Sequence, residues 1–351
     1  MIKSKQYLAV FQAILAAALF GISSPISKLL LEKIPPMLMA ALLYLGAGIG
    51  MLFMSLIKRA KGRTQKEAKM SKKELPFTIA MILLDIAAPI FLMIGLTTTT
   101  ASNASLLNNF EIVTTSIIAL FIFKEAIGKR LWIAISFITA SSVMLSVAEF
   151  SSFSFSIGSI FVLLACICWG FENNCTRMMS LKDPMQIVVV KGFGSGVGAL
   201  VIAFLTKEYA SDIGYIVIAL ILGFFAYGLS IFFYVTAQRE LGAARTSAYY
   251  AIAPFIGVSL SLLIYKETIS LNFIIAMILM ILGAYYAAVE KHLHKHIHQS
   301  IRHEHRHDHN EGHHNHTHED FENGEHSHEH THEVVQHVHK HTPDMHHAHN
   351  H

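Results

Sequence analysis

The chain has 351 residues, of which 53% are hydrophobic and only 15% are charged, and its formal net charge is +3. About 20 apolar residues are enough to cross a bilayer as a helix, so this composition predicts a membrane protein. It argues against a soluble globular domain, whose helices present an apolar stripe and a polar face. We expect no nucleic-acid partner.

Ten apolar spans follow one another along the chain, and each is long enough to be expected as a transmembrane helix. They run near residues 7–31, 36–57, 77–96, 102–123 and 131–148, and then 156–179, 185–206, 213–237, 246–265 and 271–289. The first span is too long for a cleaved signal peptide in a chain with many spans. The predicted fold class is therefore an all-α, multi-pass membrane protein whose partner is the lipid bilayer.

The second group of five spans repeats the first. Residues 101–125 and residues 243–267 both begin with small residues, continue with mostly apolar ones and end on Lys-Glu. Phe20-Gly21 in the first span likewise corresponds to Trp169-Gly170 in the sixth. Five is an odd number, so the second half must enter the membrane from the opposite side. The sequence predicts an inverted repeat, an architecture found in carriers that open to one side and then to the other.

The predicted domains are two five-helix repeats, residues 1–150 and 151–290, followed by a His-rich tail, residues 291–351. Basic residues give the orientation, because Lys and Arg accumulate in cytoplasmic loops. The loop at residues 58–73 contains eight of them, whereas Lys33, Lys207 and Lys266 belong to the opposite side. We therefore expect a multi-pass protein of the cell (inner) membrane with both termini in the cytoplasm.

Ionisable residues inside the spans are the strongest functional signal, because a charge near the bilayer centre costs at least ~2.5 kcal/mol. Asp85, Glu111, Glu172 and Lys191 lie at such positions. Glu111 ranks first, because it sits deep in the repeated segment, while Lys191 is nearer a span end and is expected to extend toward the interface. The alternative role for each carboxylate is a buried pair with Lys or an amide that fixes helix contacts.

Polar and aromatic residues beside these carboxylates are expected to line a central cavity. Pro25 and Pro89 interrupt spans in the same region, and freed backbone groups there need partners in protein or in a wet cavity. Tyr227 stands at the repeat position that matches Asp85. The expected cavity contacts are Asn108, Asn109, Asn173, Asn174, Tyr227 and Tyr249.

Two local patterns have both a functional and a structural interpretation. The run GFGSGVG at residues 192–198 lies inside an apolar span, so it predicts close helix packing through Gly-xxx-Gly pairs rather than a phosphate-binding loop. Cys168, Glu172 and Cys175 share one stripe of the sixth span, which is either a soft-metal site or packing by small residues.

All 23 histidines lie between residues 292 and 351. Their absence from the spans argues against a metal hydrolase or a His-dependent enzyme, so we predict a protein that is not an enzyme and requires no cofactor. The tail alternates His with polar residues, which predicts a disordered segment that binds divalent Zn, Ni, Co or Cu. The expected metal ligands are His303, His305, His307, His309, His326, His328, His330 and His332.

The order and spacing of these motifs resemble the drug/metabolite transporter superfamily, EamA type. The similarity rests on Phe20-Gly21 and Trp169-Gly170, on residues 101–107 leading to Glu111, and on the Lys-Glu that ends each fourth span. It covers about residues 7–289. The resemblance implies a secondary carrier, often an exporter, of small metabolites, with a cavity lined mainly by spans one, three, four, six, eight and nine.

This sequence departs from the family pattern in the fourth spans. The Glu-Pro pair is split, because Glu111 precedes Ile112 in the first copy and Ala253 precedes Pro254 in the second. The first hypothesis is a secondary transporter, driven by protons or by exchange, that exports a small molecule by alternating access. The alternatives are a divalent-metal or metal-chelate exporter and a membrane-anchored metal buffer or sensor. An oligomer is compatible with the sequence.

Overall fold

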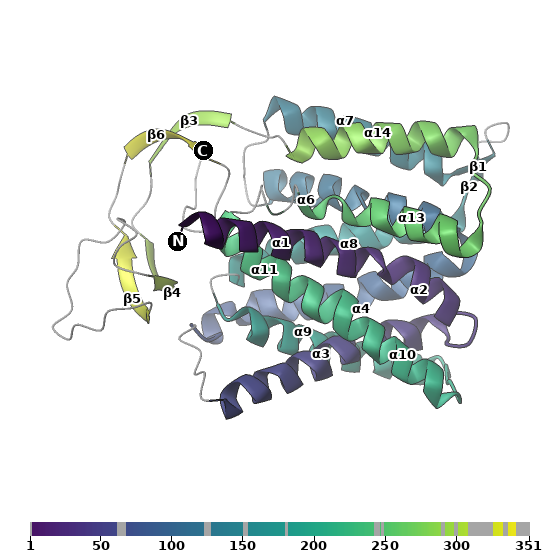
Figure 1. Cartoon of the computed structure of the whole chain (residues 1–351), viewed down its shortest axis with the longest axis horizontal. Helices are drawn as coiled ribbons and strands as arrows, with labels where there is room; N and C mark the ends of the chain where they lie inside the picture. The colour runs from purple at the N-terminus through teal and green to yellow at the C-terminus, as the bar shows by residue number, and fades with distance from the viewer. Residues whose placement is uncertain are drawn as a thin grey trace.

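The computed structural model describes residues 2–288 with gaps at 62–67, 123–127, 150–153, 180–181, 242–245 and 247–248, and four strands between residues 292 and 341. Most of the described residues up to 288 are helical, and the helices run along one common direction (Figure 1). The predicted class, an all-α multi-pass membrane protein, is confirmed. Lys124 and Glu125 lie outside the described residues.

The first half contains five helical segments in the predicted order. Their elements are α1 (Ile2–Gly21) with α2 (Ser23–Leu30), α3 (Pro36–Ala60), η1 (Lys72–Glu74) with α4 (Leu75–Thr98), α5 (Ala101–Leu107) with α6 (Phe110–Phe121), and α7 (Lys129–Ser146). Two short strands, β1 (Val147–Glu149) and β2 (Ser154–Phe155), pair antiparallel between the halves.

The second half repeats this arrangement. Its elements are α8 (Ile157–Met179), α9 (Pro184–Leu205), α10 (Ile213–Gly223) with the π-helical η2 (Phe224–Leu229) and α11 (Ser230–Leu241), then α13 (Ala253–Tyr265) and α14 (Leu271–Ala288). Seven of the described helical segments are long and apolar enough to cross a membrane. The other three predicted spans correspond to α7, α13 and α14, which are shorter.

The packing of the helices follows a two-fold pattern between the halves. The second helices of the two halves, α3 and α9, pack on each other, as do the fifth helices, α7 and α14. The third helix of the first half, α4, packs on α8, the first helix of the second half, and α11 packs on α1 in the reciprocal contact. Each half therefore completes its core with helices of the other, as an inverted repeat requires.

Glycines allow the two halves to approach closely, as the GFGSGVG run predicts. A Cβ atom at Gly192 would overlap the backbone of Gly48 on α3, and one at Gly196 would lie 2.8 Å from the backbone nitrogen of Leu45. On the other side of α9, a Cβ atom at Gly194 would lie 2.6 Å from Ile82 of α4. The interpretation of this run as close packing is confirmed.

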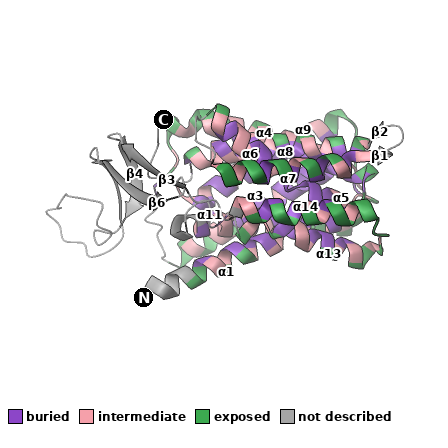
Figure 2. Cartoon of the chain, turned by 90° about the horizontal axis from the view of Figure 1, so that it is seen from above, coloured by how far each residue is buried: buried purple, intermediate pink, exposed green. Residues whose placement is uncertain are grey.

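The outer surface of the bundle is apolar. Large hydrophobic side chains such as Phe53, Leu83 and Leu263 are exposed along the helices, at 64%, 61% and 75%. Figure 2 shows exposed positions, in green, along the outward faces of the helices and buried positions, in purple, between them. Such a surface matches hydrocarbon rather than water, because lipid tails are as apolar as these side chains.

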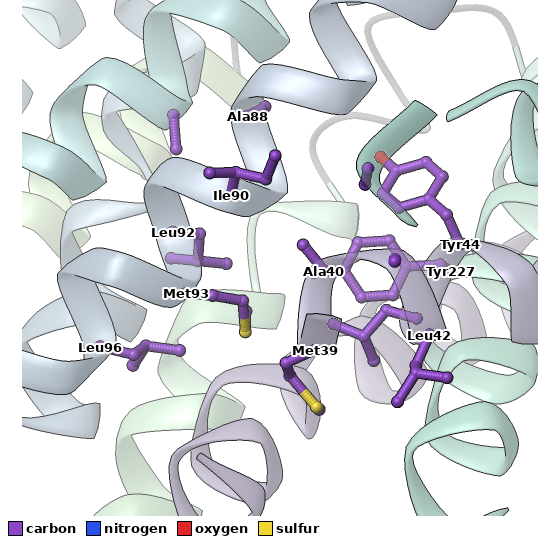
Figure 3. Close-up of a cluster of buried hydrophobic side chains, with 14 of the residues drawn as sticks. Met39, Ala40, Leu42, Tyr44, Ala88, Ile90, Leu92, Met93, Leu96 and Tyr227 are labelled. Carbon is purple, nitrogen blue, oxygen red and sulfur yellow. The ribbon is translucent and has the colours of Figure 1, made fainter. Parts of the chain in front are cut away.

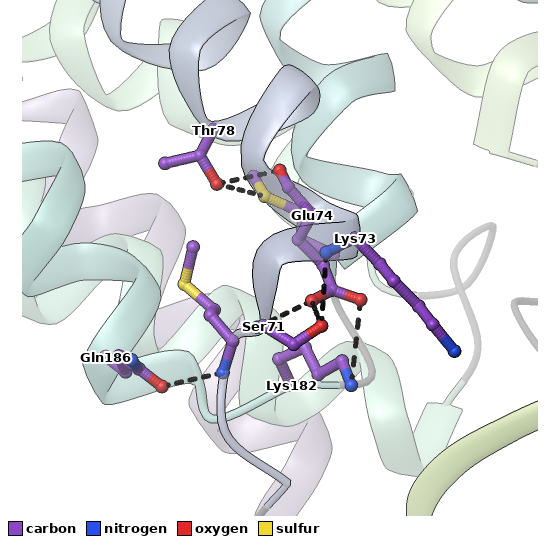
Figure 4. Close-up of polar contacts among 8 residues, drawn as sticks. Ser71, Lys73, Glu74, Thr78, Lys182 and Gln186 are labelled. Atoms are coloured by element: carbon purple, nitrogen blue, oxygen red, sulfur yellow. Dashed lines mark hydrogen bonds and ion pairs between the residues drawn. The ribbon is translucent and has the colours of Figure 1, made fainter.

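Polar contacts tie the loops together at one end of the bundle (Figure 4). Lys182 forms an ion pair with Glu74 at 3.7 Å, and Gln186 accepts a hydrogen bond from the Met70 amide at 3.0 Å. Ser71 caps η1 and forms a capping box with Glu74. Residues 68–74 therefore lie at the same end as residues 182–183 before α9, where α1 begins and α14 ends (Figure 1).

The opposite end has its own polar contacts between the halves. Glu208 accepts hydrogen bonds from the amides of Met37 and Leu38 at 2.8 and 3.1 Å, at the start of α3. Lys28 Nζ donates to the carbonyl oxygens of Leu96 and Thr99 at the end of α4. Lys33 and Lys207, which the sequence predicts to lie on the side opposite the basic loop, are close in sequence to Met37 and Glu208 and so belong to this end.

The tail, for which the sequence predicts disorder without metal, contains four described strands. Its backbone includes β3 (His292–Ile297) paired antiparallel with β6 (Gln336–His341), and β4 (Ile301–His307) paired with β5 (His326–His332). His303 is opposite His330 and His305 is opposite His328 in the register of β4 and β5.

Candidate functional site

A buried lysine joins two buried carboxylates in the interior of the bundle. Lys191 Nζ of α9 lies 3.1 Å from Asp85 Oδ2 of α4 and 2.8 Å from Glu172 Oε1 of α8, and the side chains are 5%, 0% and 3% exposed. Asp85 belongs to the first half and the other two residues to the second. A buried charge that loses its partner has neither water nor an opposite charge to stabilise it. Removing either member of such a pair is therefore strongly destabilising.

Three further helices extend this polar cluster. Tyr44 of α3 donates a hydrogen bond from its hydroxyl to Asp85 Oδ1 at 2.7 Å, and its ring lies 5.3 Å from the ring of Tyr227 in η2 (Figure 3). Ser23 of α2 donates to the Tyr227 hydroxyl at 3.2 Å. Tyr227 therefore stands near its repeat partner Asp85, with Tyr44 between them. A π-helical turn of this kind is frequent at functional sites.

Glu111 lies in the first turn of α6, where the helix dipole favours a negative charge. Its Oε1 accepts a hydrogen bond from Asn173 Nδ2 of α8 at 2.5 Å, and Asn173 also donates to Thr115 at 3.3 Å. The neighbouring Asn174 donates to the Gly170 and Thr115 carbonyls at 2.8 and 3.1 Å. Asn173 thus holds Glu111, while Asn174 fixes α8 against α6.

The fourth helix is broken just before Glu111. Asn108 and Asn109 form a turn between α5 and α6, and residues 251 and 252 form the corresponding turn before α13. Asn108 Nδ2 donates to Ser24 of α2 at 3.5 Å, and the Cys166 thiol of α8 donates to the Asn108 carbonyl oxygen at 3.9 Å. Both halves therefore have a discontinuous helix at the same place, as binding sites of secondary carriers do.

The paired motifs of the first helices meet at the centre. The rings of Phe20 and Trp169 lie 6.3 Å apart in an edge-to-face arrangement. A Cβ atom at Gly21 would lie 2.6 Å from the Ala253 carbonyl oxygen of α13, and one at Gly170 would overlap the Thr114 side chain of α6. In both halves the aromatic residue points to the partner half, and the glycine admits the fourth helix of a repeat.

The structure brings most of the predicted site residues together, with two changes. Tyr249 is 39% exposed, whereas the ring of the next residue, Tyr250, packs 5.8 Å from Phe20. Tyr250 therefore occupies the central place expected for Tyr249, because a one-residue step on a helix turns a side chain by about 100°. Lys191 does not extend toward the interface but is buried between two carboxylates.

Sequence reasoning left out Tyr44, Phe20 and Trp169 as site residues. For Phe20 and Trp169, the repeated aromatic-glycine pairs were a sequence signal that could have identified them. No sequence signal marked Tyr44, because a single Tyr in an apolar span is common. The Cys168, Glu172 and Cys175 stripe does not form a metal site, since the described part of the chain contains no group of three His, Cys, Asp or Glu side chains arranged to hold an ion.

This geometry defines a class of protein: a multi-pass membrane protein with two inverted halves around a shared polar centre. Comparison with known proteins identifies the family. The profile of the EamA-like transporter family matches residues 7–147 and again residues 156–289. The chain belongs to the EamA-like transporter family and is a membrane transporter.

Two relatives are also named as transporters, and a solved structure shares the fold. An "Uncharacterized transporter" of Methanothermobacter thermautotrophicus is 25% identical over 288 residues, which cover 78% of this chain and 83% of the relative. The "Uncharacterized transporter YyaM" of Bacillus subtilis is 21% identical over 233 residues, covering 64% and 76%. A crystal structure, titled only as that of a protein, is similar with a TM-score of 0.59 at 14% identity, over 82% of this chain and 96% of the other.

Proposed function

We propose that this protein is a secondary transporter that exports a small metabolite by alternating access, driven by protons or by exchange. The observation that supports the proposal is the buried cluster of Asp85, Lys191 and Glu172, to which both halves contribute. When one half rocks against the other, the contact between Asp85 and Lys191 changes. A group that binds there therefore acts on the equilibrium between the two orientations.

Charge counting favours proton coupling at this centre. With every group ionised, Asp85, Glu172 and Glu111 carry three negative charges against one positive charge on Lys191. Uncompensated buried charge is costly, so binding a proton or a cation at one carboxylate stabilises the closed state. Glu111 is the first candidate, because it is only part-buried and its partner Asn173 is a neutral amide.

The orientation of the protein in the membrane is inferred from its basic residues. The end with the loop at residues 58–73 faces the cytoplasm, together with both termini, in the cell (inner) membrane. The predicted cavity contacts Asn108, Asn109, Asn173 and Tyr227 meet the substrate during its passage. The protein carries out transport without chemistry on the substrate and requires no cofactor.

A second function belongs to the tail, which we propose binds Zn, Ni, Co or Cu. All 23 histidines are in this segment, mixed with carboxylates, and neutral imidazole is a common ligand of these ions. Bound metal either reaches the transporter as cargo or is buffered at the membrane. Deleting residues 292–351 separates these roles. If the membrane-spanning part exports metal supplied by the tail, cells with the truncated protein should lose metal tolerance. If it exports a metabolite, the truncated protein should still transport that metabolite.

The experiment that tests the main proposal starts by comparing metabolites and metals inside and outside cells with and without the protein. The solute that changes is then followed in proteoliposomes with imposed pH gradients. Glu111→Gln should slow transport and flatten its pH dependence, whereas Glu32→Gln, an exposed carboxylate at the end of the bundle, should not. Unchanged rate and pH dependence in Glu111→Gln would rule out the proposed role of this carboxylate.

A further inference from the structure

Aromatic rings gather at the point where the two halves meet. Phe20 lies 5.8 Å from Tyr227 and 5.8 Å from Tyr250, besides its contact with Trp169. These rings come from the first helix of each half and from the eighth and ninth spans. The face of an aromatic ring carries partial negative charge and attracts cations, especially where water is excluded.

The same region contains the excess of carboxylates. Tyr44 links Asp85 to Tyr227, because its hydroxyl donates to Asp85 at 2.7 Å and its ring lies 5.3 Å from the Tyr227 ring. Glu111 accepts a hydrogen bond from Asn173, which lies four residues after Trp169 on α8. Lys191 contacts both Asp85 and Glu172, which together still exceed it by one negative charge, and the described partner of Glu111 is the neutral amide of Asn173. Rings and uncompensated negative charge therefore share one place in the bundle.

One buried acceptor atom in this region, Asn108 Oδ1, has no hydrogen-bond partner among the described residues. Asp85 Oδ2 has one charged partner, Lys191 Nζ at 3.1 Å. Asp85 is 0% exposed and Asn108 is 7% exposed. A buried acceptor is costly when it is unpaired, so Asn108 Oδ1 marks a place for an N–H or O–H donor.

We propose that the central site binds the protonated amine of an organic cation, and that such amines are the substrate class. An ammonium group supplies a donor for Asn108 Oδ1 and the positive charge that Glu111 lacks among its described partners. Its apolar body packs on the rings of Phe20, Trp169 and Tyr227. In the closed state the rings fill the centre, so the ligand enters as the halves part. This inference rests on the proposed transport function and specifies its substrate.

Intrinsic fluorescence offers a direct test, because the chain has two tryptophans and one of them is at the site. Trp132→Phe leaves Trp169 as the sole reporter. Purified protein of this variant is titrated at pH 7 with three probes of equal chain length, n-butylamine, 1-butanol and butyrate. We expect a saturable change with butylamine at a concentration at least about tenfold lower than with butanol, and none with butyrate. Trp169→Phe, which keeps the lipid-side Trp132, corrects for partition into detergent.

Variants in the Trp132→Phe background separate the charge from the rings. Glu111→Gln should weaken butylamine binding about tenfold and leave butanol binding unchanged, since only the charged probe uses the carboxylate. Tyr227→Phe keeps the ring and should retain the preference for the amine. Circular dichroism checks that each variant is folded. If Glu111→Gln is unfolded, Glu111→Asn takes its place.

Equal binding of the three probes, or no saturable change with butylamine, would overturn the inference. So would butylamine binding that is unaffected by Glu111→Gln. The proposed function is judged separately in proteoliposomes. If a neutral or anionic metabolite moves with a dependence on Glu111, the amine inference fails and the transporter proposal stands, whereas the absence of any transported solute contradicts the proposed function itself.

Discussion

Lys191→Met tests how strongly the central cluster depends on its only described cation. The substitution keeps an unbranched side chain of similar length and removes the charge. Lys191 lies 3.1 Å from Asp85 and 2.8 Å from Glu172, and all three side chains are at least 95% buried. Removing one partner of a buried ion pair leaves an uncompensated charge, which costs on the order of 3–5 kcal/mol.

The magnitude leads to a measurable shift and a matched rescue. A loss of this size should lower the midpoint of thermal unfolding in detergent by at least about 5 °C. Neutralising the carboxylates as well, in the triple variant Lys191→Met, Asp85→Asn, Glu172→Gln, should recover most of the loss. Buried charges that are removed together cost far less than a charge that is left alone.

Size-exclusion chromatography after heating, with fluorescence detection, measures the fraction of protein that stays folded at each temperature. Glu74→Gln is the control, because its ion pair with Lys182 lies at the end of the bundle and is partly exposed, where such pairs contribute little. An unchanged midpoint in Lys191→Met would refute the reasoning. So would a triple variant that is less stable than the single one.

The remaining predictions concern the helix contact and the tail. Gly192→Leu should abolish folded expression, since the new side chain would overlap Gly48 of α3. Val197→Leu, on the exposed face of the same helix, should be tolerated. Size-exclusion chromatography of both variants measures the folded fraction. Deleting residues 292–351 should remove Ni²⁺ binding in isothermal titration calorimetry and leave the helical circular dichroism of the bundle intact. Retained Ni²⁺ binding would place the metal ligands in the bundle.

Exchanging the residues of each neighbouring pair within 325–332, so that all four histidines move by one position, should leave Ni²⁺ affinity unchanged if the tail binds as a flexible chain. A large loss would show that the register of β4 and β5 matters.

Much of the fold could be predicted because its signals repeat in the sequence. Apolar stretches of about 20 residues predicted the spans, and the matching pairs Phe20-Gly21 and Trp169-Gly170 supported the repeat. The distribution of basic residues predicted which loops lie at the same end. Gly-xxx-Gly spacing also predicted a close helix contact. It did not say which helices meet, and the structure shows that Gly192 packs on α3 and Gly194 on α4.

The site was predictable in type but not in geometry. Buried carboxylates stand out in an apolar sequence, so Asp85, Glu111 and Glu172 were identified. The position of Lys191 relative to the bilayer was misjudged, because distance from a span end does not reveal which neighbours surround a side chain. Tyr249 and Tyr250 are adjacent, and helical phase around a break cannot be read from a uniformly apolar pattern.

The central claim is that the two halves cross the membrane in opposite directions. Its most direct test is cysteine accessibility in a variant without Cys166, Cys168 and Cys175, using single cysteines at Lys124 and Lys266, the equivalent ends of the two fourth spans. With a membrane-impermeant maleimide, we predict that Lys266→Cys reacts from outside and that Lys124→Cys reacts only when the cytoplasmic side is opened, as Lys66→Cys and His351→Cys should. Reaction of Lys124→Cys and Lys266→Cys from the same side would contradict the inverted repeat and the transport cycle built on it.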